Sequence, residues 1–229
     1  MEKVVGVEDF GTGKKVRTTL EEYEAGAVIL ATGSENRKLG VAREQELTGR
    51  GVSYCATCDG NFFRKRDVAV VGGGNTALED ALYLAELANR VYLIHRRDSF
   101  RGEAASVERL RKKENVEFVF NANVTALLGE KRLSGVAVTD TRSGAVRTIE
   151  VQGLFVAVGR IPENESFRDL LEVDPAGYAV AGENCRTRVP GIFVAGDNRT
   201  KEVRQLVTAA ADGAVSATEA VRYLQENGL

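Results

Sequence analysis

The sequence predicts an α/β fold built on parallel sheets, and three features carry that prediction. A valine-rich run at 68–71 leads through three glycines into a helical pattern at 75–89. An apolar run at 91–94 follows that helix at once. Two further short apolar runs lie at 154–159 and 192–195. Runs of this length, bounded by glycine, are typical of strands buried in a parallel sheet, and a strand–helix–strand unit implies a right-handed crossover.

The N-terminal part is less regular than these units. A polar stretch that turns at residues 11–13 predicts a hairpin. The apolar run at 27–30 predicts a buried strand that ends just before Thr32 and Gly33. Residues 34–66 are mostly charged, and we expect them to be irregular.

The helical pattern at 75–89 has one apolar face, which we expect to be buried. Its members recur at spacings of three and four residues, and they are Ala77, Ala81, Leu84, Ala85 and Ala88.

Three further elements complete the chain. A charged helix is predicted at 106–114, and a long helix is predicted at about 204–225. Between them, the alternating pattern at 116–150 predicts antiparallel strands with a hairpin around residues 142–144.

Composition excludes several classes of protein. The 229 residues are 43% hydrophobic and 28% charged, as in a globular protein with a sizeable core. The net charge of −2 does not favour a nucleic-acid partner. No apolar run approaches the roughly 20 residues of a membrane-spanning helix. Because no basic segment leads into an apolar one at the N-terminus, we expect no secretory signal and a cytoplasmic location.

The triple glycine between the predicted strand and helix fits a dinucleotide-binding pattern. The pattern is G-x-G-x-x-A, formed by Gly72, Gly73, Gly74, Asn75, Thr76 and Ala77. Glycine lets the backbone approach a pyrophosphate, and the helix N-terminus offers free N–H groups to it. The alternative is a tight turn that binds no ligand. The strand before it and the helix after it favour the nucleotide site.

The end of the second strand indicates which nucleotide binds. An NAD site places an acidic residue about 20 residues beyond the glycines, whereas this chain has His95, Arg96 and Arg97, with Arg101 shortly after. Guanidinium groups bind a 2′-phosphate bidentately, so the sequence predicts NADPH. A solvated surface cluster is the alternative. We expect His95, the one histidine, to pack near the adenosine or cap a strand rather than act as a base.

Cys55 and Cys58 are two of the chain's three cysteines and form a C-x-x-C pair. Structural zinc needs four ligands, and the remaining candidates, Cys185 and His95, are far away in sequence, so no metal site is predicted. The spacing also argues against two inert thiols, because it lets the sulfurs meet and lowers a thiol pKa. We therefore interpret the pair as redox-active. Cys185 has no evident role.

A dithiol beside an NADPH site implies a relay between two kinds of chemistry. Nicotinamide delivers a hydride, whereas a disulfide is opened by nucleophilic attack on sulfur. Flavin is the usual relay, so the sequence predicts FAD. Asp59, next to Cys58, could supply the proton that a leaving thiolate needs. Alternatively, Asp59 is an ordinary turn residue before Gly60, and this interpretation suits the sequence equally well.

The C-terminal part has a second candidate cofactor motif. Gly196 and Asp197 at a strand end could bond the ribityl or phosphate region of a flavin. Arg204, Gln205 and Leu206 open the last predicted helix, whose N–H groups could stabilise negative charge on reduced flavin. A plain strand–loop–helix corner is the alternative.

Together these motifs resemble the bacterial-type, low-molecular-weight thioredoxin reductases. The resemblance covers essentially the whole chain and rests, in order, on residues 55–60, 72–77, 95–101, 191–197 and 204–205. It implies a fold of the pyridine nucleotide-disulfide oxidoreductase type, with two Rossmann-like nucleotide-binding domains. It also implies a homodimer that uses NADPH and FAD to reduce thioredoxin.

The resemblance further implies roles for individual residues. Cys58 would face the flavin, Cys55 would attack the thioredoxin disulfide, and Asp59 would be the acid. The 2′-phosphate would be held by Arg96, Arg97 and Arg101, and Thr32 and Gly33 would help to bind the cofactor. In the family, one domain rotates against the other, so that NADPH and the C-x-x-C pair take turns at the flavin.

The expected domains are a remnant of the first part of an FAD domain (1–36), an NADPH-binding domain carrying the C-x-x-C pair (37–164) and the second part of the FAD domain (165–229). The family begins with a strand, a G-x-G-x-x-G motif and a helix, and no such motif precedes residue 27. We therefore expect an incomplete FAD domain, with apolar edges exposed at 27–30 and 192–195.

Two other functions remain open on the sequence. One is a non-enzymatic NADPH-binding module. The other is a related flavin enzyme that reduces a different disulfide or serves a peroxiredoxin system. The intact NADPH motifs argue against a ferredoxin-dependent relative.

Overall fold

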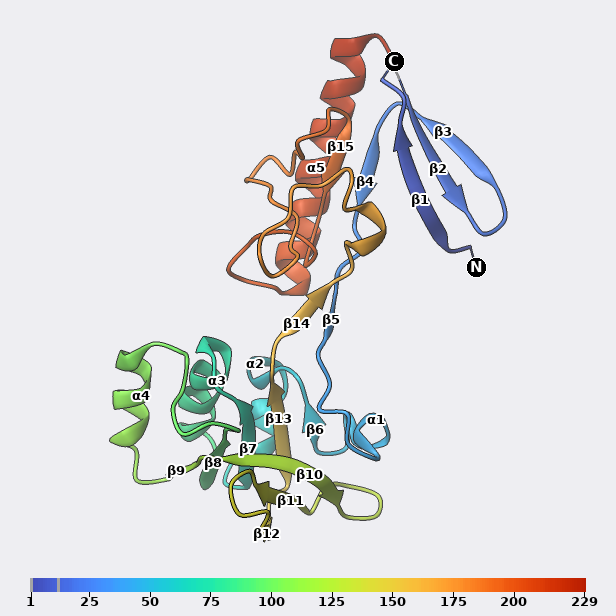
Figure 1. The fold of residues 1–229 in the computed structure, drawn as a ribbon. Helices are drawn as coiled ribbons and strands as arrows, with labels where there is room; N and C mark the ends of the chain where they lie inside the picture. The colour runs from blue at the N-terminus through green and yellow to red at the C-terminus, as the bar shows by residue number, and fades with distance from the viewer. Residues whose placement is uncertain (1, 12) are drawn as a thin grey trace. The chain divides into compact units, whose positions relative to one another are not determined.

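The structure is a computed structural model that describes residues 2–11 and 13–229 (Figure 1). The chain divides into two compact units, residues 1–35 with 160–229 and residues 36–159. Strands β5 (Ser34–Asn36) and β14 (Arg160–Pro162) lie where the chain passes between the units, and they pair in a two-stranded sheet.

The unit of residues 36–159 is built on a five-stranded parallel sheet with the order β6-β13-β7-β8-β9. Each strand is short, and the four strands other than β9 are mostly buried, as the apolar runs predict. This confirms the α/β fold class and the strands expected at 68–71, 91–94 and 154–159. The bounds are β6 (Val52–Ser53), β7 (Asp67–Gly72), β8 (Arg90–Ile94), β9 (Val116–Val119) and β13 (Gly153–Ala157).

Helix α3 (Asn75–Ala85) forms the predicted crossover between β7 and β8. Its predicted apolar face is confirmed, because every member is buried. The helix ends four residues before the predicted end at residue 89. The N–H groups of Glu86 and Leu87 bond to carbonyls three residues back, and Asn89 bonds to Arg66, which turns the chain into β8. Helix α4 (Ala104–Arg111) likewise begins and ends two to three residues earlier than predicted.

The prediction that residues 116–150 are antiparallel throughout is wrong for their first strand. Strand β9 pairs in parallel with β8 and completes the main sheet. This short edge strand alternates in sequence just as an antiparallel strand does, so the pattern alone could not separate the two. The remaining strands are antiparallel as predicted, with the hairpin turn between β11 and β12; they are β10 (Ala122–Leu128), β11 (Gly135–Asp140) and β12 (Val146–Ile149).

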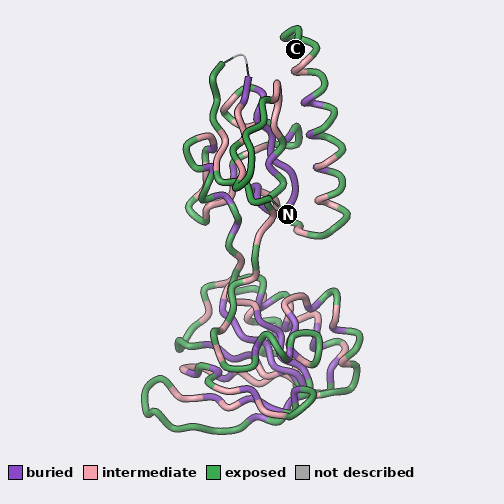
Figure 2. Tube along the Cα trace, turned by 90° about the vertical axis from the view of Figure 1, so that its right-hand side faces the viewer, coloured by how far each residue is buried: buried purple, intermediate pink, exposed green. Residues whose placement is uncertain are grey.

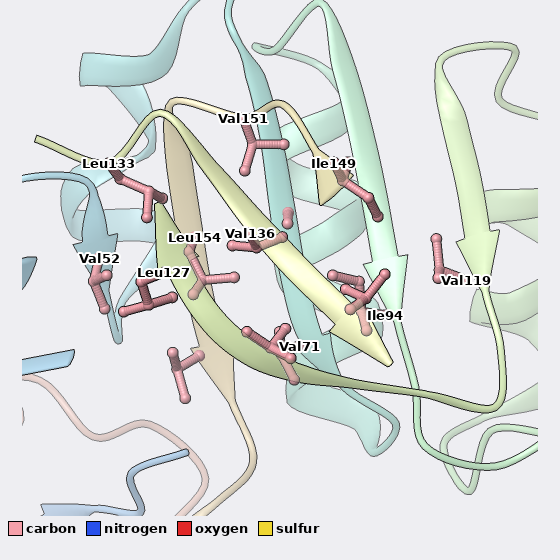
Figure 3. Packing of buried hydrophobic residues seen from close by; sticks show 14 of the residues in the cluster. Val52, Val71, Ile94, Val119, Leu127, Leu133, Val136, Ile149, Val151 and Leu154 are labelled. Carbon is pink, nitrogen blue, oxygen red and sulfur yellow. The ribbon is translucent and has the colours of Figure 1, made fainter. Parts of the chain in front are cut away.

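The buried residues of this unit gather in its interior (Figure 2). They form two clusters, one on each face of the parallel sheet. On one face, α3 and α4 cover the strands. On the other face, the three antiparallel strands β10, β11 and β12 pack against the parallel sheet. Figure 3 shows this second layer, in which Val71, Ile94 and Leu154 of the parallel sheet meet Leu127 and Val136. A sheet covered on both faces explains why its strands are nearly continuous apolar runs.

The prediction that residues 34–66 are irregular is wrong in part. The segment contains α1 (Glu44–Leu47), β6, α2 (Ala56–Asp59) and the 3-10 helix η1 (Gly60–Phe63). Helices of four residues are too short to show a helical period in sequence, so their tertiary contacts determine them.

The other unit contains a three-stranded antiparallel sheet and a parallel pair of strands. The hairpin predicted around residues 11–13 joins β1 (Val4–Asp9) to β2 (Lys14–Thr18), and β3 (Glu22–Ala25) pairs with β2. Thr12, at the predicted turn, lies outside the described residues. The strands expected at 27–30 and 192–195 are confirmed as β4 (Val28–Leu30) and β15 (Ile192–Val194), which pair in parallel.

The expectation of exposed edges holds for only one of these two strands. Ile29 of β4 is 39% exposed, whereas every residue of β15 is buried. The segment before β15 covers its edge, because Val194 N–H donates to the Cys185 carbonyl and Thr187 N–H to that of Ile192. A short 3-10 helix, η2 (Glu165–Phe167), lies earlier in this unit.

Helix α5 (Leu206–Asn227) closes the unit, two residues later at each end than predicted. Throughout the described ranges, no helix combines the length and apolarity that crossing a membrane requires.

Candidate functional site

The loop between β7 and α3 is packed too closely for side chains at two of its glycines. A Cβ on Gly72 would lie 2.4 Å from the Ala157 carbonyl oxygen, and one on Gly73 would lie 2.1 Å from the His95 ring. Gly74 instead faces open space and is the N-cap of α3, with no side chain capping the helix. The first N–H groups of α3 therefore face an open position, which is the geometry that accepts a phosphate.

The segment after β8 crosses over the start of α3. The N–H groups of Arg101 and Gly102 donate to the Gly73 carbonyl oxygen at 2.7 and 3.2 Å. Asn75 Oδ1 accepts the Glu103 N–H at 2.8 Å. Thr76 is exposed. Three hydrogen bonds thus join the loop of residues 72–74 (the glycine loop) and the start of α3 to the loop of residues 95–103 (the arginine loop).

Three positive charges lie on this second loop. Arg96, Arg97 and Arg101 are exposed, and within residues 2–11 and 13–229 no hydrogen bond or ion pair engages their guanidinium groups. Unpaired guanidinium groups near a helix N-terminus are the kind of groups that can bind a phosphorylated ligand.

His95 lies beneath the glycine loop. Its side chain is buried, and its ring lies 5.4 Å from that of Phe100 between centroids. Burial lowers the pKa of His95, and the three arginines lower it further, although a hydrogen bond to the Ser99 backbone opposes them. The imidazole is therefore neutral at pH 7, and its Nε2 has no partner among the described residues.

The cysteine pair lies at the start of α2 and is joined in a disulfide, with the two Cα atoms 5.3 Å apart. The disulfide confirms that the sulfurs can pair, as the redox interpretation requires. Cys55 is the N-cap of α2, and its Sγ accepts the Cys58 N–H at 3.2 Å. Cys55 is half-buried and Cys58 is exposed. The N–H bond favours negative charge on the Cys55 sulfur once the disulfide opens.

Ser53, which the sequence did not indicate, links Asp59 to this pair. The Ser53 hydroxyl donates to Asp59 Oδ2 at 2.6 Å and accepts the Cys55 N–H at 3.1 Å. The sequence could have indicated Ser53 only because a serine can accept the N–H two residues later in the chain. This signal is weak, since many serines stand at such positions.

Glu44 anchors the segment that carries the cysteines. The carboxylate is 4% exposed and accepts the N–H groups of Leu39 and Gly40, both at 2.9 Å, and the Tyr54 hydroxyl at 2.7 Å. Burial and the bond to Glu44 raise the pKa of Tyr54 to about 12. Tyr54 therefore remains a hydrogen-bond donor throughout the neutral range.

In the other unit, four predicted site residues lie at the carboxyl ends of the paired strands β4 and β15. Thr32 and Gly33 follow β4, and Gly196 and Asp197 follow β15. Asn198 joins the two ends, since its Nδ2 donates to the Leu30 carbonyl at 3.0 Å and to Thr32 Oγ1 at 3.1 Å. Asn198 Oδ1 is buried and has no partner within the described ranges. Asp197 pairs with Arg160 at 2.9 Å.

The start of α5 is capped by its own side chains. Gln205 is the N-cap and forms a capping box with Thr208. This box leaves the N–H groups of Leu206 and Val207 without a partner in the described part of the chain. Arg204 lies before the helix, with its guanidinium 3.9 Å from the centre of the Tyr178 ring.

A buried carboxylate holds the Gly196 loop against α5, and the sequence did not indicate it. Asp212 accepts hydrogen bonds from Arg199 at 2.6 and 2.7 Å, from Lys201 at 2.8 Å and from the Gly196 N–H at 2.9 Å. Burial acts to raise the pKa of Asp212, but these bonds outweigh it and hold the pKa well below its usual range. Cys185 lies beside this cluster, fully buried, and burial raises the pKa of its thiol.

Comparisons with known proteins agree with this geometry. Residues 2–213 match the family described as pyridine nucleotide-disulphide oxidoreductase. The thioredoxin reductase of Listeria monocytogenes is 44% identical over 218 residues, which cover 93% of this chain and 68% of that protein. The thioredoxin reductase of Peptoclostridium acidaminophilum is 41% identical, with coverages of 99% and 74%.

Solved structures give the same result. The thioredoxin reductase from Streptococcus pyogenes superposes with a TM-score of 0.92 at 39% identity, covering 98% of this chain and 74% of that one. The thioredoxin reductase from Giardia duodenalis has a TM-score of 0.90 at 35% identity, with coverages of 98% and 74%. The chain thus spans about two-thirds to three-quarters of the length of these relatives.

Replacing Asp212 with asparagine should destabilise the chain by about 3–5 kcal/mol, because Arg199 and Lys201 would remain buried without a counter-charge. Urea unfolding followed by circular dichroism would measure the loss. Glu165→Gln is the matched control, because Glu165 pairs with Arg168 at 2.9 Å on an exposed surface. We expect the control to change stability by less than about 1 kcal/mol. Equal losses in the two variants would contradict the role given to Asp212.

Proposed function

Because the chain belongs to the thioredoxin reductases of the pyridine nucleotide-disulphide oxidoreductase family, we propose that it carries electrons from NADPH through FAD to the Cys55–Cys58 disulfide and on to thioredoxin. The observation that carries this proposal is the combination, within residues 36–159, of a C-x-x-C disulfide with an open glycine loop and three unpaired arginines. A nucleotide-binding module alone would have no use for the disulfide.

The glycine and arginine loops would hold NADPH. The pyrophosphate would lie at Gly74, against the free N–H groups of α3. Arg96, Arg97 and Arg101 would bind the 2′-phosphate, a group that NADH lacks. His95 would support the loop by packing, because a neutral buried imidazole beneath Gly73 adds no charge to the site.

The unit of residues 1–35 and 160–229 would bind FAD. The acceptor on Asn198 Oδ1 and the open position at Gly33 suit a ligand rich in hydroxyl and phosphate groups. The free N–H groups of Leu206 and Val207 suit an electron-rich ring edge. When bound, FAD supplies the exchange between a hydride donor and a disulfide, which side chains alone do not perform.

The two cysteines would carry out the thiol exchange. After reduction of the pair, the Cys55 thiolate attacks one sulfur of the thioredoxin disulfide; that S–S bond breaks and a mixed disulfide forms. The Cys58 thiolate then attacks the Cys55 sulfur, which restores the Cys55–Cys58 bond and releases the second thioredoxin sulfur as a thiolate. Asp59, held by Ser53, would donate a proton to a departing thiolate.

We also propose a homodimer in the cytoplasm. The support is the likeness of its motifs to the bacterial-type enzymes and the redox logic of the pair, because a C-x-x-C dithiol that reduces other proteins works in a reducing compartment.

The visible absorption spectrum tests the proposed function directly. The purified chain would be mixed with FAD, freed of excess flavin and then supplied with NADPH and oxidised thioredoxin. We expect a retained flavin band that bleaches with NADPH, followed by thioredoxin reduction. A colourless protein that still binds NADPH would contradict the reductase function and favour a nucleotide-binding module.

Replacing Cys58 with serine should trap a mixed disulfide, because Cys55 could still attack thioredoxin but nothing would displace it. The pre-reduced variant would be mixed with oxidised thioredoxin, and the adduct would be detected by intact mass under non-reducing conditions. Cys185→Ser in the same background is the control and should not change the yield, because that thiol is buried. Equal trapping by Cys55→Ser would reverse the roles given to the two cysteines.

Replacing Arg96 and Arg97 with alanine should raise the dissociation constant of NADPH about 100-fold or more, since each charged hydrogen-bonding group contributes about 1.5–3 kcal/mol. The dissociation constant of NADH should change by less than about threefold. Nicotinamide fluorescence reports both titrations without flavin turnover. A similar loss for the two nucleotides would mean that these arginines do not touch the 2′-phosphate.

A further inference from the structure

The arginine loop contains one carboxylate, and a residue from a different sheet binds it. Asp98 is the only acidic residue between His95 and Gly102. Its Oδ2 accepts a hydrogen bond from Arg142 Nη2 at 2.9 Å. Arg142 lies in the turn between β11 and β12, which the sequence indicated only as a hairpin.

Backbone hydrogen bonds hold this turn beside the arginine loop. The Asn121 N–H donates to the Arg97 carbonyl at 3.0 Å, and the Thr141 N–H donates to the Asn121 carbonyl at 2.6 Å. Arg142 is the next residue. This chain of bonds runs from the arginine loop through the start of β10 to the turn, so the approach of Arg142 to Asp98 follows from the backbone.

Hydrogen bonds to one carboxylate also order the turn internally. Asp140 Oδ1 accepts the N–H of Arg142 at 2.9 Å, and the N–H and hydroxyl of Ser143 at 2.7 and 2.9 Å. The Ser143 and Arg142 N–H groups hold the pKa of Asp140 below its usual value, so this carboxylate remains charged and keeps its bonds at neutral pH. The backbone at Arg142 is therefore held by Asp140 within the turn.

The pairing determines which groups in the loop face an incoming anion. An unpaired Asp98 would repel a 2′-phosphate, or would occupy a neighbouring guanidinium that the phosphate needs. With Asp98 bound to Arg142, the loop presents Arg96, Arg97 and Arg101 without an internal competitor.

We propose that Arg142 is a specificity-determining residue for NADPH, which acts by neutralising Asp98 rather than by touching the nucleotide. This inference rests on the proposed function, in which the arginine loop binds the 2′-phosphate. Arg142 is thus a positioning residue, and its influence should reach NADPH but not NADH.

A double-mutant cycle of Arg142→Ala and Asp98→Asn tests whether Arg142 acts on nucleotide affinity through Asp98. Dissociation constants for NADPH and NADH would be measured with the full chain by nicotinamide fluorescence at fixed ionic strength. We expect Arg142→Ala to weaken NADPH about fivefold and to leave NADH within about 1.5-fold, as suits an exposed ion pair. In the Asp98→Asn background, Arg142→Ala should have no further effect on either nucleotide.

Arg147→Ala is the matched control. Arg147 lies on β12 and pairs with Glu117 at 3.3 Å, and its side chain is 56% exposed, against 65% for Arg142. Its loss should leave the ratio of NADPH to NADH affinity unchanged. A control that weakens NADPH as much as Arg142→Ala would mean that any loss of surface charge has this effect, and would overturn the inference.

The other outcomes are equally decisive. If Arg142→Ala still weakens NADPH in the Asp98→Asn background, Arg142 contacts the nucleotide itself and the positioning role is wrong. If the unmodified chain prefers NADPH and Arg142→Ala keeps that preference intact, this inference fails alone. If the unmodified chain shows no preference for NADPH, the proposed function fails and the inference fails with it.

Discussion

The contact of Gly72 and Gly73 with their neighbours is the constraint on which the unit of residues 36–159 depends. With no Cβ at either position, the loop lies directly against the Ala157 carbonyl and the His95 ring. That contact fixes the start of α3 at the carboxyl end of the parallel sheet. It also allows the Gly73 carbonyl to accept two N–H groups of the arginine loop. This one close contact thus positions both the glycine loop and the arginine loop of the proposed nucleotide site.

Carboxylates anchor three other segments through their backbone N–H groups. Glu44 binds the loop before the cysteines, Asp212 binds the Gly196 loop, and Asp140 orders the turn that carries Arg142. Each accepts at least one backbone N–H that no sheet ladder satisfies. A carboxylate accepting several such bonds remains ionised well below neutral pH, as the lowered pKa values of Asp140 and Asp212 indicate. These segments have irregular backbones, but hydrogen bonds to the carboxylates order them.

The sequence predicts the parts of this molecule whose signals are local. The valine-rich strand, the glycine loop and the face of α3 follow from adjacent residues, and the structure confirms them. The parallel pairing of β9 depends on which strand lies beside it, and alternation does not reveal that. Asp212 and Arg199 are 13 residues apart, and only the return of α5 along the strands brings them together. Ser53 becomes relevant only once Cys55 is known to be the N-cap of α2.

The contrast between the two kinds of ion pair bears on how nucleotide preference can change. The cluster around Asp212 is buried, so losing one partner leaves an uncompensated charge and costs about 3–5 kcal/mol, a large share of the stability of an ordinary domain. The Asp98–Arg142 pair is about two-thirds exposed on both sides, and such a pair contributes about 1 kcal/mol at most to stability. We therefore expect substitutions at Arg142 to leave the fold intact and to act mainly on the charge around the proposed 2′-phosphate site. If Arg142 acts as proposed, the residues that support the fold and those that tune specificity are separated by burial, and nucleotide preference can shift without loss of the parallel sheet.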